Sequence, residues 1–229
     1  EMKHRIGTMG RELNLDLNEA QVQTIDSFFL ELVKEYALHL DLDPALEVLA
    51  GVELQDRLKA SGSKAMTENI EKNPDLPPLL KLMNVRRDQF ESGLKLVYEK
   101  MRQREDIRQL TPEDLKGHPK LVGEVLEDGE LSISEDKYYT YQKLILHMVK
   151  YVDRDFFERK RSQGKLDYTD VLDLALRLMD RETICREVSD KYGHILIDEF
   201  QDTNRRQSQV FKKLFEAGSH LFIVGDGKQ

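Results

Sequence analysis

Hydrophobic residues recur along most of the chain at intervals of three and four positions, which is the spacing of one face of an α-helix. Four such stripes predict helices, at residues 28–40, 90–101, 144–156 and 172–179. Two other apolar runs, at residues 193–198 and 220–225, are short and lead into acidic residues, which is typical of buried strands that deliver acidic groups to the carboxyl edge of a sheet. The pattern therefore predicts an α/β core with a largely helical middle.

Polar residues mark where these helices begin. Thr24 or Asp26 can cap the first helix, and Asp167 or Thr169 can cap the fourth. Their side-chain oxygens can accept hydrogen bonds from the free backbone N–H groups of a first helical turn. The third helix is expected to begin near Glu135, well before its apolar stripe.

Glycine, serine and proline residues mark the expected loops. These loops lie at residues 61–63, 73–78 and 111–119. Residues 120–133 contain Gly123 and the pair Asp128-Gly129, which predict a small hairpin. No internal repeat or low-complexity tract interrupts the chain.

The two predicted strands carry acidic side chains at their carboxyl ends, where open α/β folds bind their ligands. The first strand ends in Asp198 and Glu199, and a third carboxylate follows at Asp202. There Asp198 can hold Mg²⁺ that bridges nucleotide phosphates, while Glu199 can orient and deprotonate the attacking water. The second strand leads into Asp226. The two units together indicate a nucleotide-driven protein.

These two units also carry a family resemblance. The segment I-L-I-D-E-F-Q-D-T-N from residue 195, followed by V-G-D-G-K-Q from residue 224, resembles motifs II and III of the UvrD-like superfamily 1 DNA helicases. It is especially similar to the RecB and AddA type of helicase-nuclease motor. The alternative is an apolar strand followed by an acidic helix cap. That alternative accounts for residues 195–197 and Asn204, but it explains neither Gln201 nor the second unit.

The resemblance implies ATP and Mg²⁺ as cofactors and gives each polar residue of the two motifs a role. It implies that Asp198 holds Mg²⁺ and that Glu199 is the catalytic carboxylate. Gln229 would sense the γ-phosphate and link its state to DNA. Three further residues would support the metal–water network or motif III: Gln201, Asp202 and Asp226.

Three other segments resemble parts of the same helicases. Residues 1–6 resemble the end of motif Ia, and residues 166–172 resemble the D-[FY]-x-D-L element that precedes motif II. Residues 22–29 resemble motif Ic, usually T-x-H-S-F, with Asp26 in place of the histidine. Thr24 and Ser27 are therefore either contacts to the DNA backbone or plain capping residues.

The formal net charge of −8 argues against a small, wholly basic DNA-binding module, because phosphate contacts need clustered lysine and arginine. A local basic face is still compatible with DNA binding. The main candidate is the run Arg159, Lys160 and Arg161, with others at residues 86–87 and 102–108. Each run can instead be a solvated helix face, since no aromatic side chains are interleaved at regular spacing.

The order of the motifs implies the fold class. We expect an α/β, partial RecA-like P-loop NTPase motor domain that is interrupted by a large, mostly α-helical insertion. Residues 1–40 would form its N-terminal part with motifs Ia and Ic, residues 41–164 the insertion, and residues 165–229 its C-terminal part with motifs II and III. The alternative for the middle region is an independent helical domain without a role in DNA tracking.

The sequence contains no G-x-x-x-x-G-K-[ST] loop, whose backbone amides would hold the phosphates of ATP. In the helicase family this loop precedes motif Ia, so we expect the chain to be a fragment of a longer motor and inactive by itself. The partners that the resemblance implies are single-stranded or duplex DNA, a second RecA-like domain and a helicase-nuclease partner subunit. The alternative function is a non-catalytic DNA-binding or scaffolding subunit with a motor-like fold.

Several other protein classes are disfavoured. Cys185, which we expect to lie buried or half-buried in a helix, is the only cysteine; this excludes an internal disulfide framework and suits a reducing cytosol. No histidine pair lies at a zinc-ligand spacing, and no serine lies in a nucleophile-elbow sequence. No run approaches the roughly 18 continuous apolar residues of a membrane span. The resemblance implies a DNA helicase that acts in recombination or double-strand break repair, and the single cysteine suits the expected cytoplasmic location.

Overall fold

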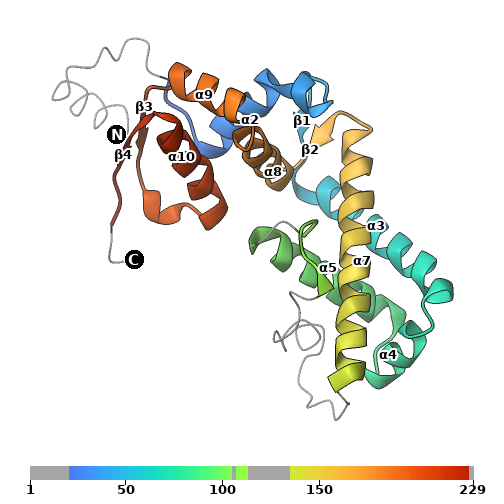
Figure 1. The fold of residues 1–229 in the computed structure, drawn as a ribbon. Coiled ribbons are helices and arrows are strands. Elements are labelled where there is room, and N and C mark those ends of the chain that lie inside the picture. Colours follow the sequence, from blue (N-terminus) through green and yellow to red (C-terminus); the bar gives the residue numbers. More distant parts are fainter. Residues whose placement is uncertain (1–20, 105–106, 113–134, 227–229) are drawn as a thin grey trace.

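The computed structural model describes residues 21–104, 107–112 and 135–226, which form two lobes (Figure 1). The first lobe contains helices α2 (Ile25–Glu35), α8 (Tyr168–Met179), α9 (Glu182–Lys191) and α10 (Arg205–Ala217), with strands β3 (His194–Ile197) and β4 (His220–Ile223). The second lobe contains helices α3 (Gly51–Lys72), α4 (Leu76–Leu82), α5 (Arg87–Arg104) and α7 (Glu135–Arg161). The segment that resembles motif Ia and the expected hairpin lie outside the described residues.

Two short strands lie where the chain leaves the first lobe and where it returns. Strand β1 (Glu47–Val48) follows the 3-10 helix η2 (Ala37–Leu40), and strand β2 (Lys165–Leu166) follows α7. The two strands pair in parallel, with Glu47 opposite Lys165 and Val48 opposite Leu166 (Figure 1). The chain therefore leaves the first lobe and returns to it at the same place, through two strands that pair with each other.

The first lobe has a hydrophobic core that joins its four helices. Phe28 and Phe29 of α2 are buried in this core, as their place in the predicted stripe requires. The rings of Phe28 and Phe211 stack with their centroids 6.1 Å apart, which ties α2 to α10. Cys185 of α9 is buried in the same core, which confirms the expected buried helical cysteine.

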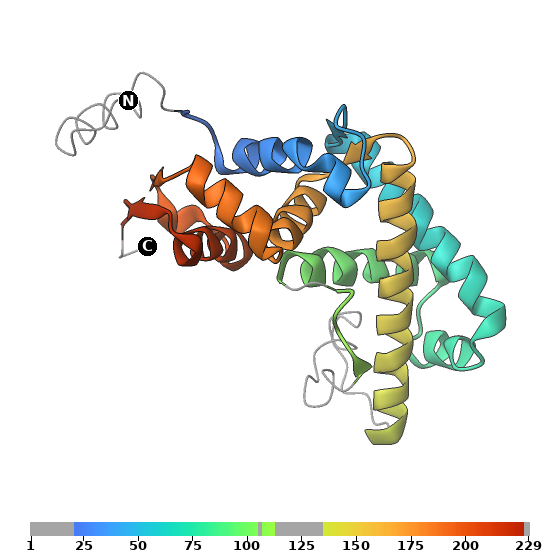
Figure 2. The ribbon, with the colours of Figure 1, turned by 45° about the horizontal axis from the view of Figure 1, so that its top comes forward.

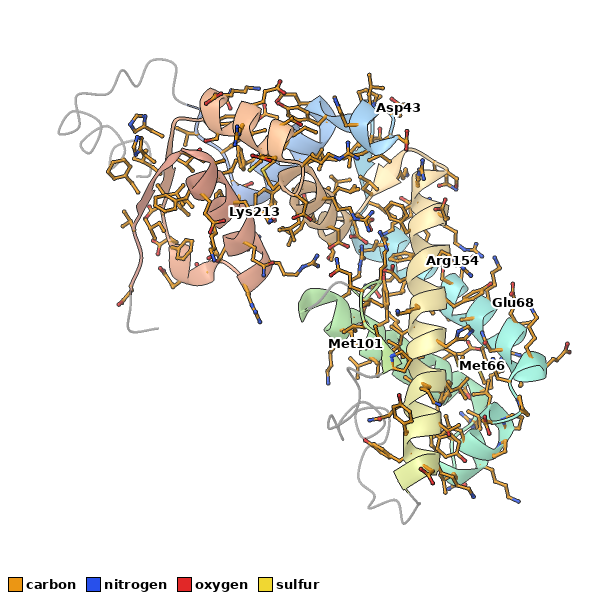
Figure 3. All side chains as sticks on the ribbon, viewed as in Figure 1. Asp43, Met66, Glu68, Met101, Arg154 and Lys213 are labelled. Atoms are coloured by element: carbon orange, nitrogen blue, oxygen red, sulfur yellow. The ribbon has the colours of Figure 1, made fainter. Side chains whose placement is uncertain are left out.

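The second lobe has a separate core around the long helix α7, which crosses α3 and α5 (Figure 2). The predicted stripe at residues 144–156 of α7 faces this core, and α7 begins at Glu135 as expected. Met66 of α3, labelled in Figure 3, is fully buried here together with Leu94 and Tyr98 of α5. Within the described ranges, no helix combines the length and apolarity needed to cross a membrane.

The predicted caps at the starts of α2 and α8 are confirmed. The Thr24 side chain accepts from the backbone N–H of Ser27 at 3.2 Å. Asp167 and Asp170 exchange side-chain and backbone hydrogen bonds in a capping box, each 2.9 Å long. Asn204 forms a similar box with Gln207 at the start of α10. Polar residues therefore set the beginning of each of these helices.

The expected loop at residues 61–63 is wrong, because these residues lie inside α3. Ser61 and Gly62 are buried, and the Ser61 hydroxyl donates to Asp155 of α7 at 2.8 Å. The packing of α3 against α7, which includes this bond, outweighs the weak helix propensity of serine and glycine. The expected loop at residues 73–78 is correct only for residues 73–75, because α4 begins at Leu76. Pro77 and Pro78 lie in the first turn of this helix, where proline is tolerated.

Four buried charges join the lobes between the end of α5 and the start of α8. Arg102 of α5 donates to Asp167 at 2.7 Å, and Lys160 of α7 lies 2.5 Å from the same carboxylate. Both cations also pair with Asp170. Lys160 is 0% exposed and Arg102 is 7% exposed. Neither residue can belong to a solvated basic face, so including them in the surface runs was wrong.

These pairs favour the ionised form of Asp167. Burial alone would raise the pKa of Asp167, but the neighbouring Arg102 and Lys160 outweigh it and hold that pKa well below its usual range. An acid whose pKa is lowered by folding stabilises the fold above its unfolded pKa. That stabilisation is lost as the pH falls through the folded-state value.

We predict that Asp167→Asn lowers the free energy of unfolding by about 3 kcal/mol at pH 7, because it leaves two buried cations one carboxylate short. The loss should shrink as the pH falls below 3.8, the ordinary pKa of aspartate, because Asp167 of the unfolded wild-type chain then begins to take up a proton while the folded carboxylate stays ionised. Urea unfolding at several pH values measures both effects. Asp56→Asn, at an exposed position of α3, is the control and should change stability by less than about 0.5 kcal/mol.

Candidate functional site

The candidate site lies at the carboxyl ends of β3 and β4, which pair in parallel from His194–His220 to Ile197–Ile223 (Figure 1). Backbone bonds continue past both strands: the N–H of Val224 donates to Ile197 at 2.8 Å, and the N–H of Phe200 donates to Val224 at 3.0 Å. The ladder therefore draws the turn after β3 against the segment after β4. Residues of the two predicted motifs meet at this edge.

Glu199 occupies a left-handed backbone conformation, with φ 53° and ψ 43°. This conformation is uncommon for a residue with a side chain, and such residues gather at active sites, where the surrounding structure holds them. The N–H of Glu199 donates to the Asp198 carboxylate at 3.1 Å. The chain then turns into the 3-10 helix η4 (Phe200–Asp202). The two carboxylates therefore lie between the end of β3 and this turn.

Gln201 connects the two motifs. Its amide nitrogen donates to the Glu199 carboxylate at 2.6 Å, and its amide oxygen accepts from the backbone N–H of Asp226 at 3.0 Å. A carboxylate cannot donate and a backbone N–H cannot accept, so this amide orientation is the only one that satisfies both partners. Gln201 therefore fixes the Glu199 side chain relative to the segment after β4.

Gly225 makes this connection sterically feasible. A Cβ atom at this position would lie 2.5 Å from the Gln201 amide oxygen and 3.3 Å from the backbone nitrogen of Phe200. The 2.5 Å contact would force the Gln201 amide to move, whereas the 3.3 Å contact is only tight. The glycine of the second motif therefore allows the backbone after β4 to approach the turn after β3.

The carboxylates of the site are accessible to a ligand. Asp198 is half-buried, whereas Glu199, Asp202 and Asp226 are exposed. Among the described residues, no group of three His, Cys, Asp or Glu side chains is placed to hold a metal ion. Mg²⁺ commonly takes only one or two carboxylates, and phosphate and water oxygens fill its remaining positions. The donor set at this edge fits that mode of binding, while Gln229 lies outside the described residues.

The start of α2 lies beside the start of α10. The Gln207 side chain donates to the Asp26 carboxylate at 3.2 Å, which joins the segment resembling motif Ic to the helix after motif II. Thr24 and Ser27 are both exposed, and the Thr24 hydroxyl donates to the Ser27 hydroxyl at 2.8 Å. The capping role of Thr24 is thus confirmed, and its contact with DNA stays a prediction.

The three residues of the predicted basic run at the end of α7 differ in their exposure to solvent. Lys160 points inward to the charges at the start of α8 and is not available to DNA. Arg159 is half-buried and pairs with Asp155 at 2.5 Å. Arg161 is exposed and donates to the backbone oxygen of Asp41 at 2.9 Å. Arg159 and Arg161 remain candidates for DNA contact.

Sequence reasoning did not identify Arg206, which lies in the first turn of α10, directly after the site. Its guanidinium pairs with Asp173 of α8 and is buried. Burial raises the pKa of Asp173, although Arg206 and Arg102 oppose this shift. A signal was present: Arg206 lies four residues before Val210, on the buried face of α10.

Comparison of the sequence with those of known proteins identifies the family of this chain. The whole chain, residues 1–229, matches the sequence model of the UvrD/REP helicase N-terminal domain. It is 29% identical over 231 residues to the A subunit of the ATP-dependent helicase/nuclease of Staphylococcus saprophyticus, which covers 93% of the chain and 18% of the relative.

Shorter matches link the chain to relatives of the same name. It is 38% identical over 89 residues to the Listeria monocytogenes protein, covering 36% of the chain and 7% of the relative. It is 32% identical over 94 residues to the Syntrophomonas wolfei protein, covering 41% and 8%. The chain thus spans less than a fifth of the length of these relatives. Because the family model covers every residue, the chain belongs to the UvrD/REP helicase N-terminal domain family.

Proposed function

We propose that this chain is part of the ATPase motor of a DNA helicase of the AddA and RecB type, which unwinds DNA and moves along a single strand during recombination and double-strand break repair. The observation that carries the proposal is the bridge formed by the Gln201 side chain. Its amide nitrogen donates to the Glu199 carboxylate at 2.6 Å, and its amide oxygen accepts from the backbone N–H of Asp226 at 3.0 Å. A carboxylate fixed beside a second motif can act on a bound phosphate group.

In the proposed reaction each residue at this edge has one task. Asp198 contributes an oxygen ligand for Mg²⁺, which would neutralise charge on the phosphate oxygens of ATP. Glu199 orients the attacking water and takes its proton. Gln201 keeps the Glu199 side chain in place through their 2.6 Å hydrogen bond. Gln229 senses the γ-phosphate, and Asp202 and Asp226 support the surrounding network of water and backbone.

We propose the following division of labour. Residues 1–40 and 165–229 belong to the RecA-like motor, and residues 41–164 form an insertion within it. Two separate hydrophobic cores support this division, since the helices between β1 and β2 supply the second core. ATP turnover would close the motor against a second RecA-like domain and so advance the DNA strand. A helicase-nuclease partner subunit would complete the assembly.

The outer face of α7 supports contact with DNA. Between residues 137 and 154 the only carboxylate of this helix is Asp153, which is buried and pairs with Arg108 at 2.8 Å. Lys143, His147 and Arg154 are exposed over the same stretch, and Figure 3 labels Arg154 on α7. A face with exposed cations and no exposed acid suits a phosphate backbone. Arg159 and Arg161 lie beyond this stretch, toward the junction of the lobes, where the exposed Glu158 is also present.

Our first prediction for this function concerns the intact protein. Glu199→Gln keeps the size of the side chain but removes the base, so DNA-stimulated ATP turnover should fall by about 10²-fold or more. ATP binding should be retained. Steady-state hydrolysis measures the loss, with Glu216→Gln on the exposed face of α10 as the control. Turnover above half of the wild-type rate would remove Glu199 from this role. The absence of ATP turnover in the wild-type protein would favour the alternative of a non-catalytic DNA-binding protein.

A second prediction concerns DNA affinity of the intact protein. Arg159→Ala and Arg161→Ala should each reduce the salt dependence of single-strand binding, by about 0.7 in the slope of log K against log salt for each phosphate group that is no longer neutralised. Arg186→Ala is the control, since Arg186 also forms an ion pair four residues along its helix, with Glu182. Unchanged slopes for both variants would show that the end of α7 is a solvated face.

A third prediction concerns the 229-residue chain by itself. Its sequence lacks the glycine-rich phosphate loop, so nothing holds ATP in line with Glu199, and positioning supplies most of the catalysis in phosphoryl transfer. Millimolar Mg-ATP should therefore leave its melting temperature nearly unchanged, because a Kd of about 1 mM stabilises by only a few tenths of a kcal/mol. Clear ATP turnover by this chain, lost in Asp198→Ala, would show that the phosphate site is misplaced.

A further inference from the structure

Arg206 touches both lobes from the first turn of α10. One end of its guanidinium pairs with Asp173 of α8, and the other end donates to the backbone oxygen of Arg102, in α5, at 3.3 Å. The side chain is 7% exposed. A planar guanidinium with acceptors at both ends has one orientation that satisfies them, and burial removes water as a replacement partner. The relative position of α5, α8 and α10 is therefore set at this residue.

The α5 end of this contact is itself held firmly. The Arg102 guanidinium donates to Asp167 at 2.7 Å, and Lys160 of α7 binds the same carboxylate at 2.5 Å. Arg102 Nε is buried without a hydrogen-bond acceptor and lies 3.9 Å from Asp153. Because removing one member would leave a buried charge without its partner, the network resists rearrangement. Movement of the second lobe would therefore carry the Arg102 carbonyl with it.

The other end of Arg206 leads directly to the candidate site. Its backbone N–H donates to the Asn204 side chain at 2.9 Å, which caps α10. Thr203 is tied back to Phe200 by a 2.6 Å hydrogen bond from its hydroxyl to the backbone oxygen. The segment between α10 and the turn after β3 is thus short and internally bonded. A displacement of the first turn of α10 would reach Gln201, which holds Glu199.

We propose that Arg206 is a positioning residue through which the helical second lobe sets the orientation of Glu199. This inference rests on the proposed ATPase function. DNA bound to the second lobe acts through Arg102, Arg206 and the α10 cap on the catalytic turn. The coupling acts on the rate of the chemical step and not on ATP affinity, because neither Arg206 nor Asp173 lies in the nucleotide site.

A lysine at this position separates coupling from folding. Lysine keeps a cation opposite the buried Asp173, so the ion pair is preserved. It carries one compact ammonium in place of a fork of nitrogens, and a single group meets both Asp173 and the Arg102 carbonyl less well. Arg206→Lys should therefore fold while loosening the contact between the lobes. Arg205→Lys, at the exposed neighbouring position, makes the same chemical change outside the network.

The test uses the intact protein and measures ATP hydrolysis with and without single-stranded oligodeoxythymidylate. Arg206→Lys should reduce the stimulation of kcat by DNA about fivefold or more, on the scale of an ordinary coupling between sites. The DNA-independent rate and the KM for ATP should stay within about twofold of wild type. Arg205→Lys should retain full stimulation. Asp173→Asn, which keeps an oxygen acceptor for Arg206, is the second variant and should reduce stimulation in the same direction.

Two outcomes would overturn the inference. Full stimulation in both Arg206→Lys and Asp173→Asn would show that the contact carries no coupling. Equal loss of the basal and stimulated rates, with a lower melting temperature, would show a structural role only. The Glu199→Gln variant distinguishes failure of this inference from failure of the proposed function. If wild-type turnover does not depend on Glu199, both proposals fail. If it does, and Arg206→Lys behaves as wild type, only the coupling fails.

Discussion

The structure depends on the neutralisation of buried carboxylates at the start of α8. Asp167 and Asp170 serve as the capping box of that helix, and both are buried. Unpaired carboxylates could not remain ionised there, because the cost of removing them from water is several kcal/mol each. Arg102 and Lys160 supply the neutralising charge, and both come from the second lobe. The cap of a first-lobe helix therefore requires helices of the second lobe to be in place.

The acidic residues of the chain are sorted by their exposure to solvent. Those at the start of α8 are buried against cations, and their charge is neutralised inside the protein. Those at the carboxyl edge of the strands, such as Glu199 and Asp226, face solvent and can meet a cation brought by a ligand. The same residue type thus serves folding in one place and chemistry in another. Access to water decides which.

The chemistry of the edge depends on backbone geometry as much as on side chains. The left-handed Glu199 turns the chain out of β3, and Gly225 leaves room for the Gln201 amide. Neither feature binds a ligand. Together they allow one glutamine to hold a carboxylate and a backbone N–H of the next motif in fixed relation. A site built this way responds to small shifts of the helix that follows it.

Features that arise from neighbours along the chain could be predicted from the amino-acid sequence. Apolar periodicity predicted α2, α5, α7 and α8, and polar residues predicted the caps at Thr24 and Asp167. Two short apolar runs predicted β3 and β4, and the motifs that follow them carried the resemblance to the family. Tertiary structure decided what depends on distant partners. From the sequence alone, Lys160 and Arg102 were expected to be surface charges. In the fold both pair with Asp167 and Asp170, which lie 65 and 68 residues beyond Arg102. Ser61 and Gly62 were expected to lie in a loop, but the packing of α3 against α7 keeps them in a helix. Local sequence carries periodicity and capping chemistry, whereas burial of a charge is a property of the assembled fold.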